Sequence, residues 1–182
     1  MTDSLNASEE LVWLENDVLS GATWGELPTE SRTWLYTADR VLKSEEREAF
    51  AQSIDAFIAS WAAHGKSLQA SWRLEGGRCL MIALDESSPE ATGCSIDSKV
   101  HWLRGVGAQM EVDWMGRGQV IHYNVSGARW EESSLAQFWA ARKAGRVEAS
   151  TPLVNGVIAK KLDCHPTLVV PFERSWHEEM WR

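Results

Sequence analysis

The stretch LQASWRLEGGRCLMIAL, residues 68–84, constrains the fold of this chain more than any other part of the sequence. Its first half alternates apolar and polar side chains, which is typical of a half-buried β-strand. Gly76 and Gly77 suit a tight hairpin turn. The second half, RCLMIAL, is nearly all apolar, as in a strand that is covered on both faces. The stretch therefore predicts a β-hairpin in the interior of a sheet.

Two amphipathic segments flank this hairpin. Ser44, followed by Glu45 and Glu46, is a suitable start for a helix, and Gly65 is a suitable left-handed stop. The apolar positions of this first helix form one stripe, namely Phe50, Ile54, Phe57, Ile58 and Trp61. A second helix is predicted from Cys94 to about Met110. Its expected core face is Ile96, Val100, Leu103, Val106 and Met110.

Strands are predicted before the first helix and after the second. TWLYTADRVL, residues 33–42, is rich in strand-forming residues, and a further strand lies within 111–126, bent around GRG at 116–118. The resulting order β-α-β-β-α-β is that of a ferredoxin-like α+β core. A helix over about 133–145, the strand-like TPLVNGVIAKKL and a tryptophan-rich C-terminal segment are expected to extend this core.

The N-terminal residues 1–31 are interpreted as an accessory segment, and residues 32–182 as a single α+β domain. Within the accessory segment, SEELVWLENDVLSG predicts a short helix with Ser8 as its N-cap and Gly21 as its stop. ATWGELPTESR then predicts a loop.

Charge and cysteine usage exclude several classes of function. The formal net charge is −8 and the pI is about 5.1, so duplex nucleic acid and anionic membrane surfaces are poor partners. No apolar run is long enough for a membrane span, and the N-terminus lacks the features of a secretion signal. The three cysteines, Cys79, Cys94 and Cys164, do not suggest a disulfide framework. We therefore expect a cytoplasmic protein.

The predicted topology brings one group of polar residues to a single edge of the sheet. The first helix ends there, the hairpin opens and closes there, the second helix begins there, and the first strand starts there. The residues at this edge are Arg32, His64, Asp85, Glu86, Gly93, Cys94, Ser95 and Asp97.

This edge supports a catalytic hypothesis. A thiol in the first turn of a helix gains thiolate character, so Cys94 would be the nucleophile. His64 would be the base, with Asp85 or Glu86 orienting it. The amides of Gly93–Ser95 would donate hydrogen bonds to an anion or oxyanion. Negative charge at Asp85, Glu86 and Asp97 opposes this chemistry, because it raises the pKa of a nearby thiol.

Two further interpretations of the same residues stay open. In a purely structural one, Thr92 or Ser95 caps the helix and Asp97 interacts with its first amides, while Gly93 permits a turn. Cys94 then fills space, and His64 is a satisfied core histidine. In the other, Asp85, Glu86, Asp97 and His64 hold a metal ion, but no tight ligand spacing supports this. We therefore assign no metal and expect no cofactor.

The favoured function is a binding or interaction module. Its site would recognise a small polar ligand or a protein partner through Arg32, Glu86, Gly93, Ser95 and Asp97, with Trp side chains contributing contact surface. The alternative is a thiol-dependent enzyme that uses Cys94 and His64. Self-association is also left open. Nucleotide and RNA binding are disfavoured, because the chain has no G-x-x-x-x-G-K-[ST] loop and GRCLMIAL carries no aromatic side chain.

Several segments resemble a family of small uncharacterised bacterial proteins. They are RTWLYTADRVL, WAAHGKSL, ALDE, ATGCSID and the later P…SWH, and the family shares W-x-x-H-G, D-E and G-C-S-I-D motifs. The resemblance covers residues 32–177, and G-C-S-I-D is its most specific part. Some members are labelled ABC-transporter ATPases, a label that this sequence does not support because it has no Walker A loop. The resemblance implies no activity, cofactor or catalytic residue.

Overall fold

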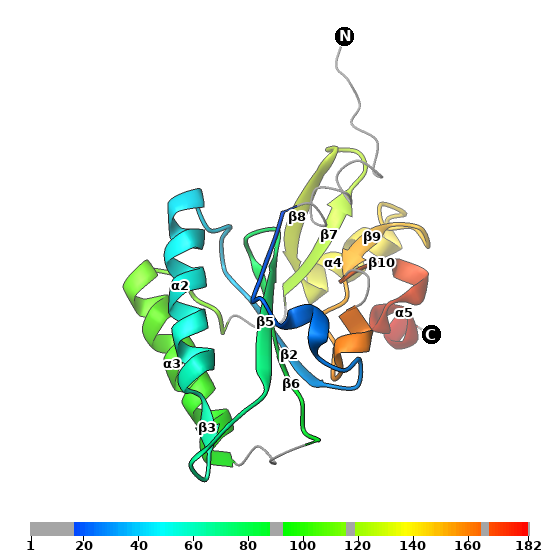
Figure 1. Ribbon diagram of the computed structural model, residues 1–182. Coiled ribbons are helices and arrows are strands. Elements are labelled where there is room, and N and C mark those ends of the chain that lie inside the picture. Colours follow the sequence, from blue (N-terminus) through cyan, green and yellow to red (C-terminus); the bar gives the residue numbers. More distant parts are fainter. Residues whose placement is uncertain (1–16, 88–92, 116–118, 165–167, 182) are drawn as a thin grey trace. The chain divides into compact units, whose positions relative to one another are not determined.

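The computed structural model describes residues 17–87, 93–115, 119–164 and 168–181, apart from the side chain of Cys94 (Figure 1). These residues form an α+β protein that divides into two compact units. The N-terminal unit contains Asp17–Gly116 and Ile158–Asp163, and the C-terminal unit contains Arg117–Val157 and Cys164–Arg182. Each unit has its own antiparallel sheet and its own hydrophobic core.

The sheet of the N-terminal unit has the order β1 (Val18–Ser20), β5 (Ala70–Glu75), β6 (Cys79–Leu84) and β2 (Arg32–Thr37). The predicted hairpin is confirmed, because β5 and β6 pair antiparallel around a turn in which Gly76 and Gly77 both have φ of 59°. β6 is buried along its whole length, as its apolar sequence predicts.

Helices α2 (Ser44–Ser60) and α3 (Gly93–Met110) cover one face of this sheet (Figure 1), and both helices are confirmed. The core beneath α2 includes Phe50 and Ile54, which are fully buried. Gly65, however, does not end α2. It lies with His64 in the turn of a small hairpin, β3 (Ala62–Ala63) and β4 (Lys66–Ser67), where both residues have positive φ.

The N-terminal segment differs from its prediction. The expected helix from Ser8 to Gly21 falls mostly outside the described residues, but Val18–Ser20 forms strand β1 rather than a helix. The reason is tertiary, because β1 pairs with the edge of β5 and so satisfies backbone groups that β5 would otherwise leave open. Gly21 is needed for close approach, since a Cβ there would lie 2.7 Å from the Ser71 hydroxyl oxygen. A short 3₁₀ helix, Trp24–Glu26, follows.

The strand expected within 111–126 is not part of this sheet. It is β7 (Gln119–Asn124), which belongs to the sheet of the C-terminal unit, and the bend expected at 116–118 lies outside the described residues. The prediction that this strand joins the sheet of the β5–β6 hairpin was therefore wrong. A different segment, residues 158–163, returns to the N-terminal unit, where the amide of Thr33 donates to the carbonyl of Ala159.

The sheet of the C-terminal unit has the order β10 (Val169–Pro171), β9 (Pro152–Val154), β7 and β8 (Arg129–Ser134). Helix α4 (Leu135–Lys143) confirms the helix predicted over 133–145, and α5 (Trp176–Trp181) lies near the C-terminus. Within TPLVNGVIAKKL only β9 is a strand. Short 3₁₀ helices form at Lys161–Cys164 and Phe172–Arg174. The core of the unit includes Val120, Phe138, Val147, Leu153 and Phe172.

The tryptophans mainly pack against other aromatic side chains. In the N-terminal unit, Phe50 contacts the rings of Trp72, Trp102 and Trp114 at centroid distances of 6.4, 6.0 and 5.0 Å. Among the tryptophans that the structure describes, Trp181 is the exposed one, with 37% of its surface accessible. Across the same described ranges, no helix is both long and apolar enough to cross a membrane.

Candidate functional site

The edge predicted from the sequence does bring several of its residues together. Arg32 begins β2 and pairs in register with Leu84, the last residue of β6. This pairing places the guanidinium of Arg32 3.2 Å from the carboxylate of Glu86, just beyond the strand. Both side chains are 44% exposed, so this ion pair contributes little to stability.

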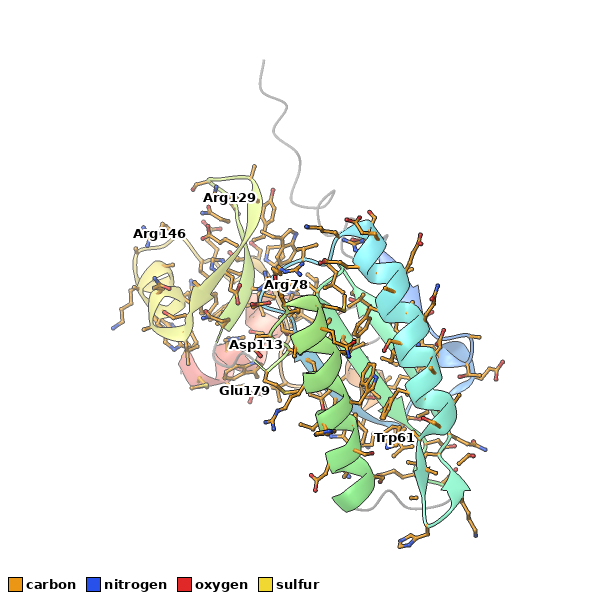
Figure 2. The ribbon with its side chains drawn as sticks, turned by 90° about the vertical axis from the view of Figure 1, so that its left-hand side faces the viewer. Trp61, Arg78, Asp113, Arg129, Arg146 and Glu179 are labelled. Carbon is orange, nitrogen blue, oxygen red and sulfur yellow. The ribbon has the colours of Figure 1, made fainter. Side chains whose placement is uncertain are left out.

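The start of α3 also joins this edge. Trp61 lies where α2 ends (Figure 2), and its indole Nε1 donates to the backbone oxygen of Ser95 at 2.8 Å. Ser95 is buried, whereas Gly93 and Asp97 are exposed. Asp85 accepts a hydrogen bond from the amide of Ser87, which lowers the pKa of its carboxyl group.

The proposed pairing of Cys94 with His64 stays a prediction. His64 is exposed, with φ of 50°, and makes no hydrogen bond or ion pair with any residue that the structure describes. It lies in a hairpin turn rather than on the buried stripe of a helix, so it is not a satisfied core histidine. The backbone of Cys94 lies in the first turn of α3, but its side chain is outside the described part.

Lys99 is the most unusual charged residue in the N-terminal unit. It lies on α3 one turn after Ser95 and is completely buried. Its Nζ lies 3.2 Å from the centroid of the Trp34 ring and 5.3 Å from that of Tyr36, and no hydrogen-bond partner exists for it among the described residues. Burial, together with the charge of Arg32, lowers the pKa of Lys99 to about 6. The amine is therefore largely neutral at neutral pH.

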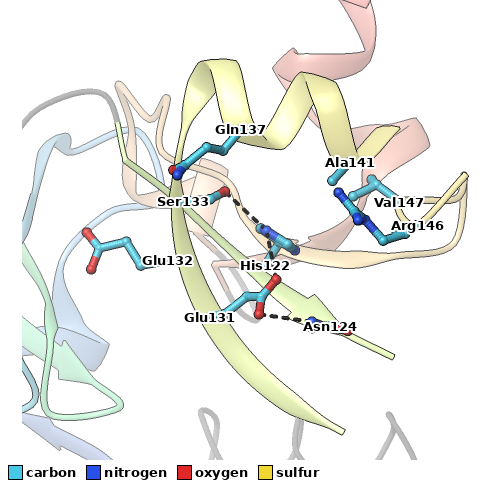
Figure 3. A pocket seen from close by; sticks show the side chains of 9 residues that line it. All are labelled: His122, Asn124, Glu131, Glu132, Ser133, Gln137, Ala141, Arg146 and Val147. Atoms are coloured by element: carbon cyan, nitrogen blue, oxygen red, sulfur yellow. Dashed lines mark hydrogen bonds and ion pairs between the residues drawn. The ribbon is translucent and has the colours of Figure 1, made fainter. Parts of the chain in front are cut away.

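The C-terminal unit contains a pocket (Figure 3). Its volume is about 380 Å³, within the range of small-molecule sites. It is formed by β7, β8, α4 and the residues that follow α4. The lining residues are His122, Asn124, Glu131, Glu132, Ser133, Gln137, Ala141, Arg146 and Val147.

Strand pairing explains why these polar groups meet. His122 of β7 lies opposite Glu131 of β8, and side chains two residues apart on a strand share a face. Asn124 therefore reaches Glu131 diagonally, and its Nδ2 donates to Glu131 Oε2 at 2.9 Å. Gln137 enters the pocket from the first turn of α4, where it forms a capping box with Ser134.

His122 is the chemical centre of the pocket. Figure 3 shows it between Ser133 and Glu131 on one side and Arg146 on the other. Its Nε2 lies 3.2 Å from the hydroxyl oxygen of Ser133 and 3.8 Å from Glu131 Oε1. The side chain is nearly fully buried, and burial lowers the pKa of His122 although Glu131 acts in the opposite direction. The ring is therefore a neutral hydrogen-bonding group at neutral pH.

A second buried histidine also packs against Phe138. The ring of Phe138 is 5.2 Å from that of His122 and 5.3 Å from that of His177. Burial lowers the pKa of His177 to about 4, with a smaller contribution from the charge of His122. Phe138 therefore contacts two buried imidazoles, of which His122 lines the pocket.

The arrangement of Ser133, His122 and Glu131 is not a catalytic relay. In a serine–histidine–acid triad the acid orients one ring nitrogen while the other accepts the proton of the nucleophile. Here Ser133 and Glu131 both approach Nε2. The geometry suits recognition of a ligand and does not activate Ser133.

The sequence interpretation missed this pocket and Lys99. The sequence QVIHYN does not alternate and gave only a weak signal for His122, namely that residues two apart on a strand share a face, which places His122 with Val120 and Asn124. Nothing local marks Lys99 as buried. In the described ranges no group of three or more His, Cys, Asp or Glu side chains could hold a metal ion.

No family model, curated protein or solved structure matches the chain. The resemblance of the W-x-x-H-G and G-C-S-I-D segments therefore stays a prediction.

Proposed function

We propose that this protein is a binding module for a small polar molecule, and that the molecule binds in the pocket of the C-terminal unit. The observation that carries the proposal is the position of His122, a buried and neutral imidazole that lines a cavity of about 380 Å³. Buried polar groups that converge on a cavity fix the orientation of a ligand.

The lining supports a metabolite rather than a peptide. At about 30 Å³ per water molecule, the volume corresponds to roughly a dozen waters. Ala141 and Val147 supply a small apolar wall, whereas His122, Ser133 and Asn124 supply hydrogen-bonding groups. A ligand with a short apolar part and at least one hydroxyl or similar group matches these surfaces.

A pair of matched variants tests the proposal. Ala141→Phe places a large ring in the pocket without altering its polar groups, whereas Ala140→Phe makes the same change on an exposed position of α4 outside the lining. Lactate and glycerol serve as hydroxyl-bearing probes in a nuclear magnetic resonance titration of the full chain. We expect amides of β7, β8 and α4 to shift on titration, and these shifts to disappear in Ala141→Phe and to remain in Ala140→Phe.

Two results contradict the proposal. In one, none of four small hydroxyl-bearing probes, lactate, lactamide, glycerol and glycerol phosphate, affects these amides in the unmodified chain. In the other, Ala141→Phe binds the probes as well as Ala140→Phe does, which places binding elsewhere.

We also propose that the run β2–α2–β5–β6–α3 is a ferredoxin-like arrangement without its fourth strand. The order of β5, β6 and β2 in the sheet supports this. In this proposal the N-terminal unit serves as scaffold, and the edge that carries Arg32 and Glu86 is a secondary candidate for contact with a partner.

A further inference from the structure

The charged groups that line the pocket differ in how they are already engaged. Glu131 accepts a hydrogen bond from Asn124 and lies 3.8 Å from His122 and 4.0 Å from Arg129. Its carboxylate therefore already has a hydrogen-bond donor in Asn124 and a cation nearby in Arg129. Figure 3 shows Glu132 directed away from the other lining side chains.

Arg146 is engaged differently. It follows α4 and lines the pocket on the side opposite Glu131 (Figure 3). Its backbone amide donates to the carbonyl of Ala141 at 2.9 Å, which fixes the chain at this point. Within the described residues, its guanidinium makes no hydrogen bond or ion pair. The pocket thus offers a ligand one uncommitted cation.

The chemistry of a guanidinium defines its complement. Its planar donor fork matches the oxygens of a carboxylate or a phosphate, and such charge-assisted bonds are stronger than neutral ones. On the other side, the hydroxyl of Ser133 and the neutral ring of His122 suit an uncharged polar group. The two ends of the pocket therefore differ in the charge that they accept.

We infer that the ligand is a small anion whose carboxylate or phosphate group binds Arg146 and whose hydroxyl or other uncharged polar group reaches Ser133 and His122. This inference rests on the proposed binding function and names the ligand class of the same site. Ala141 and Val147 then contact the carbon atoms between the two polar ends.

Four probes and three variants test the inference. Lactate is compared with its neutral amide lactamide, and glycerol phosphate with glycerol, in titrations of the isotope-labelled full chain. Arg146→Gln removes the charge, Arg146→Lys keeps it without the planar fork, and Lys143→Gln removes the same charge from an exposed position outside the lining.

We expect at least one of the two anions, lactate or glycerol phosphate, to bind more tightly than its uncharged analogue. Arg146→Gln should weaken that binding at least about tenfold, Arg146→Lys less, and Lys143→Gln not measurably. Whether lactate or glycerol phosphate binds more tightly distinguishes a carboxylate ligand from a phosphate ligand.

The contrary outcomes separate the two proposals. If lactamide and glycerol bind as tightly as their anions and Arg146→Gln has no effect, the anion inference is wrong and the binding function stands. If none of the four probes shifts amides of β7, β8 or α4, both are wrong.

Discussion

Lys99 shows how the surroundings of one residue can oppose its ordinary chemistry. A lysine in water has a pKa near 10.5, whereas the buried amine of Lys99 has a pKa of about 6. At pH values between these two pKa values, the Lys99 amine is protonated in the unfolded chain and neutral in the folded chain. Stability therefore falls as the pH decreases from about 10.5 to about 6, and changes no further with this group below that range.

Replacing Lys99 should stabilise the protein. Lys99→Met keeps much of the side-chain volume over Trp34. It also removes the cost of deprotonating the amine when the chain folds. We therefore expect the free energy of unfolding to rise by roughly 1–4 kcal/mol at neutral pH. The gain should shrink as the pH rises toward the ordinary pKa of lysine. Urea unfolding at a series of pH values measures it.

Lys143→Met, at an exposed position, serves as the control and should change the free energy of unfolding by less than about 0.5 kcal/mol. A gain from Lys99→Met that is independent of pH would show that the amine is not neutral in the folded protein.

At the scale of single elements, α4 is a capped helix that also contributes to the lining of the pocket. Its capping box joins Ser134, whose hydroxyl accepts from the amide of Gln137, to the side chain of Gln137, which accepts from the amide of Ser134. The same Gln137 lines the pocket. The start of α4 therefore fixes one wall of the proposed binding site.

Removing the cap should loosen that wall. Ser134→Ala leaves an amide of the first turn unsatisfied, and we expect a loss of about 1 kcal/mol in the free energy of unfolding. Hydrogen exchange should also become faster in α4. Ser126→Ala, in the exposed turn between β7 and β8, is the comparison. Equal effects of the two substitutions would argue against a capping role for Ser134.

At the scale of the whole molecule, each core contains a cluster of aromatic rings among its aliphatic side chains. Phe50 is fully buried against Trp72, Trp102 and Trp114 in the N-terminal unit. In the C-terminal unit Phe138 is fully buried against Trp139 and Phe172. Many of the tryptophans therefore pack in or against the two cores, where their rings are tilted, stacked or edge-on to other aromatic rings.

The aromatic core predicts a large effect for one truncation. Phe50→Ala removes a ring from this close-packed set and should cost about 3–5 kcal/mol. Tryptophan fluorescence during urea unfolding reports the change directly, because three indoles surround the site. Val125→Ala, at an exposed position, should change stability by less than about 0.5 kcal/mol. A loss below 1 kcal/mol for Phe50→Ala would mean that the site collapses around the missing ring.

The sequence by itself determined the elements whose signals are local. The β5–β6 hairpin follows from alternation and two glycines, and α2, α3 and α4 follow from apolar periodicity and their first-turn residues. It also brought Arg32 and Glu86 to one edge, because strand order alone requires that. Whether that edge is a site stays a prediction.

Only the tertiary structure decided the features that depend on partners far away in the chain. Val18–Ser20 is a strand because the edge of β5 is available to it, and β7 joins β8 and β9 rather than the first sheet. The pocket around His122 exists because β7, β8 and α4 meet there. Lys99 is buried because α3 presents it to Trp34, although its charge predicts exposure. In each case the free energy comes from long-range pairing and burial, which local propensity does not encode.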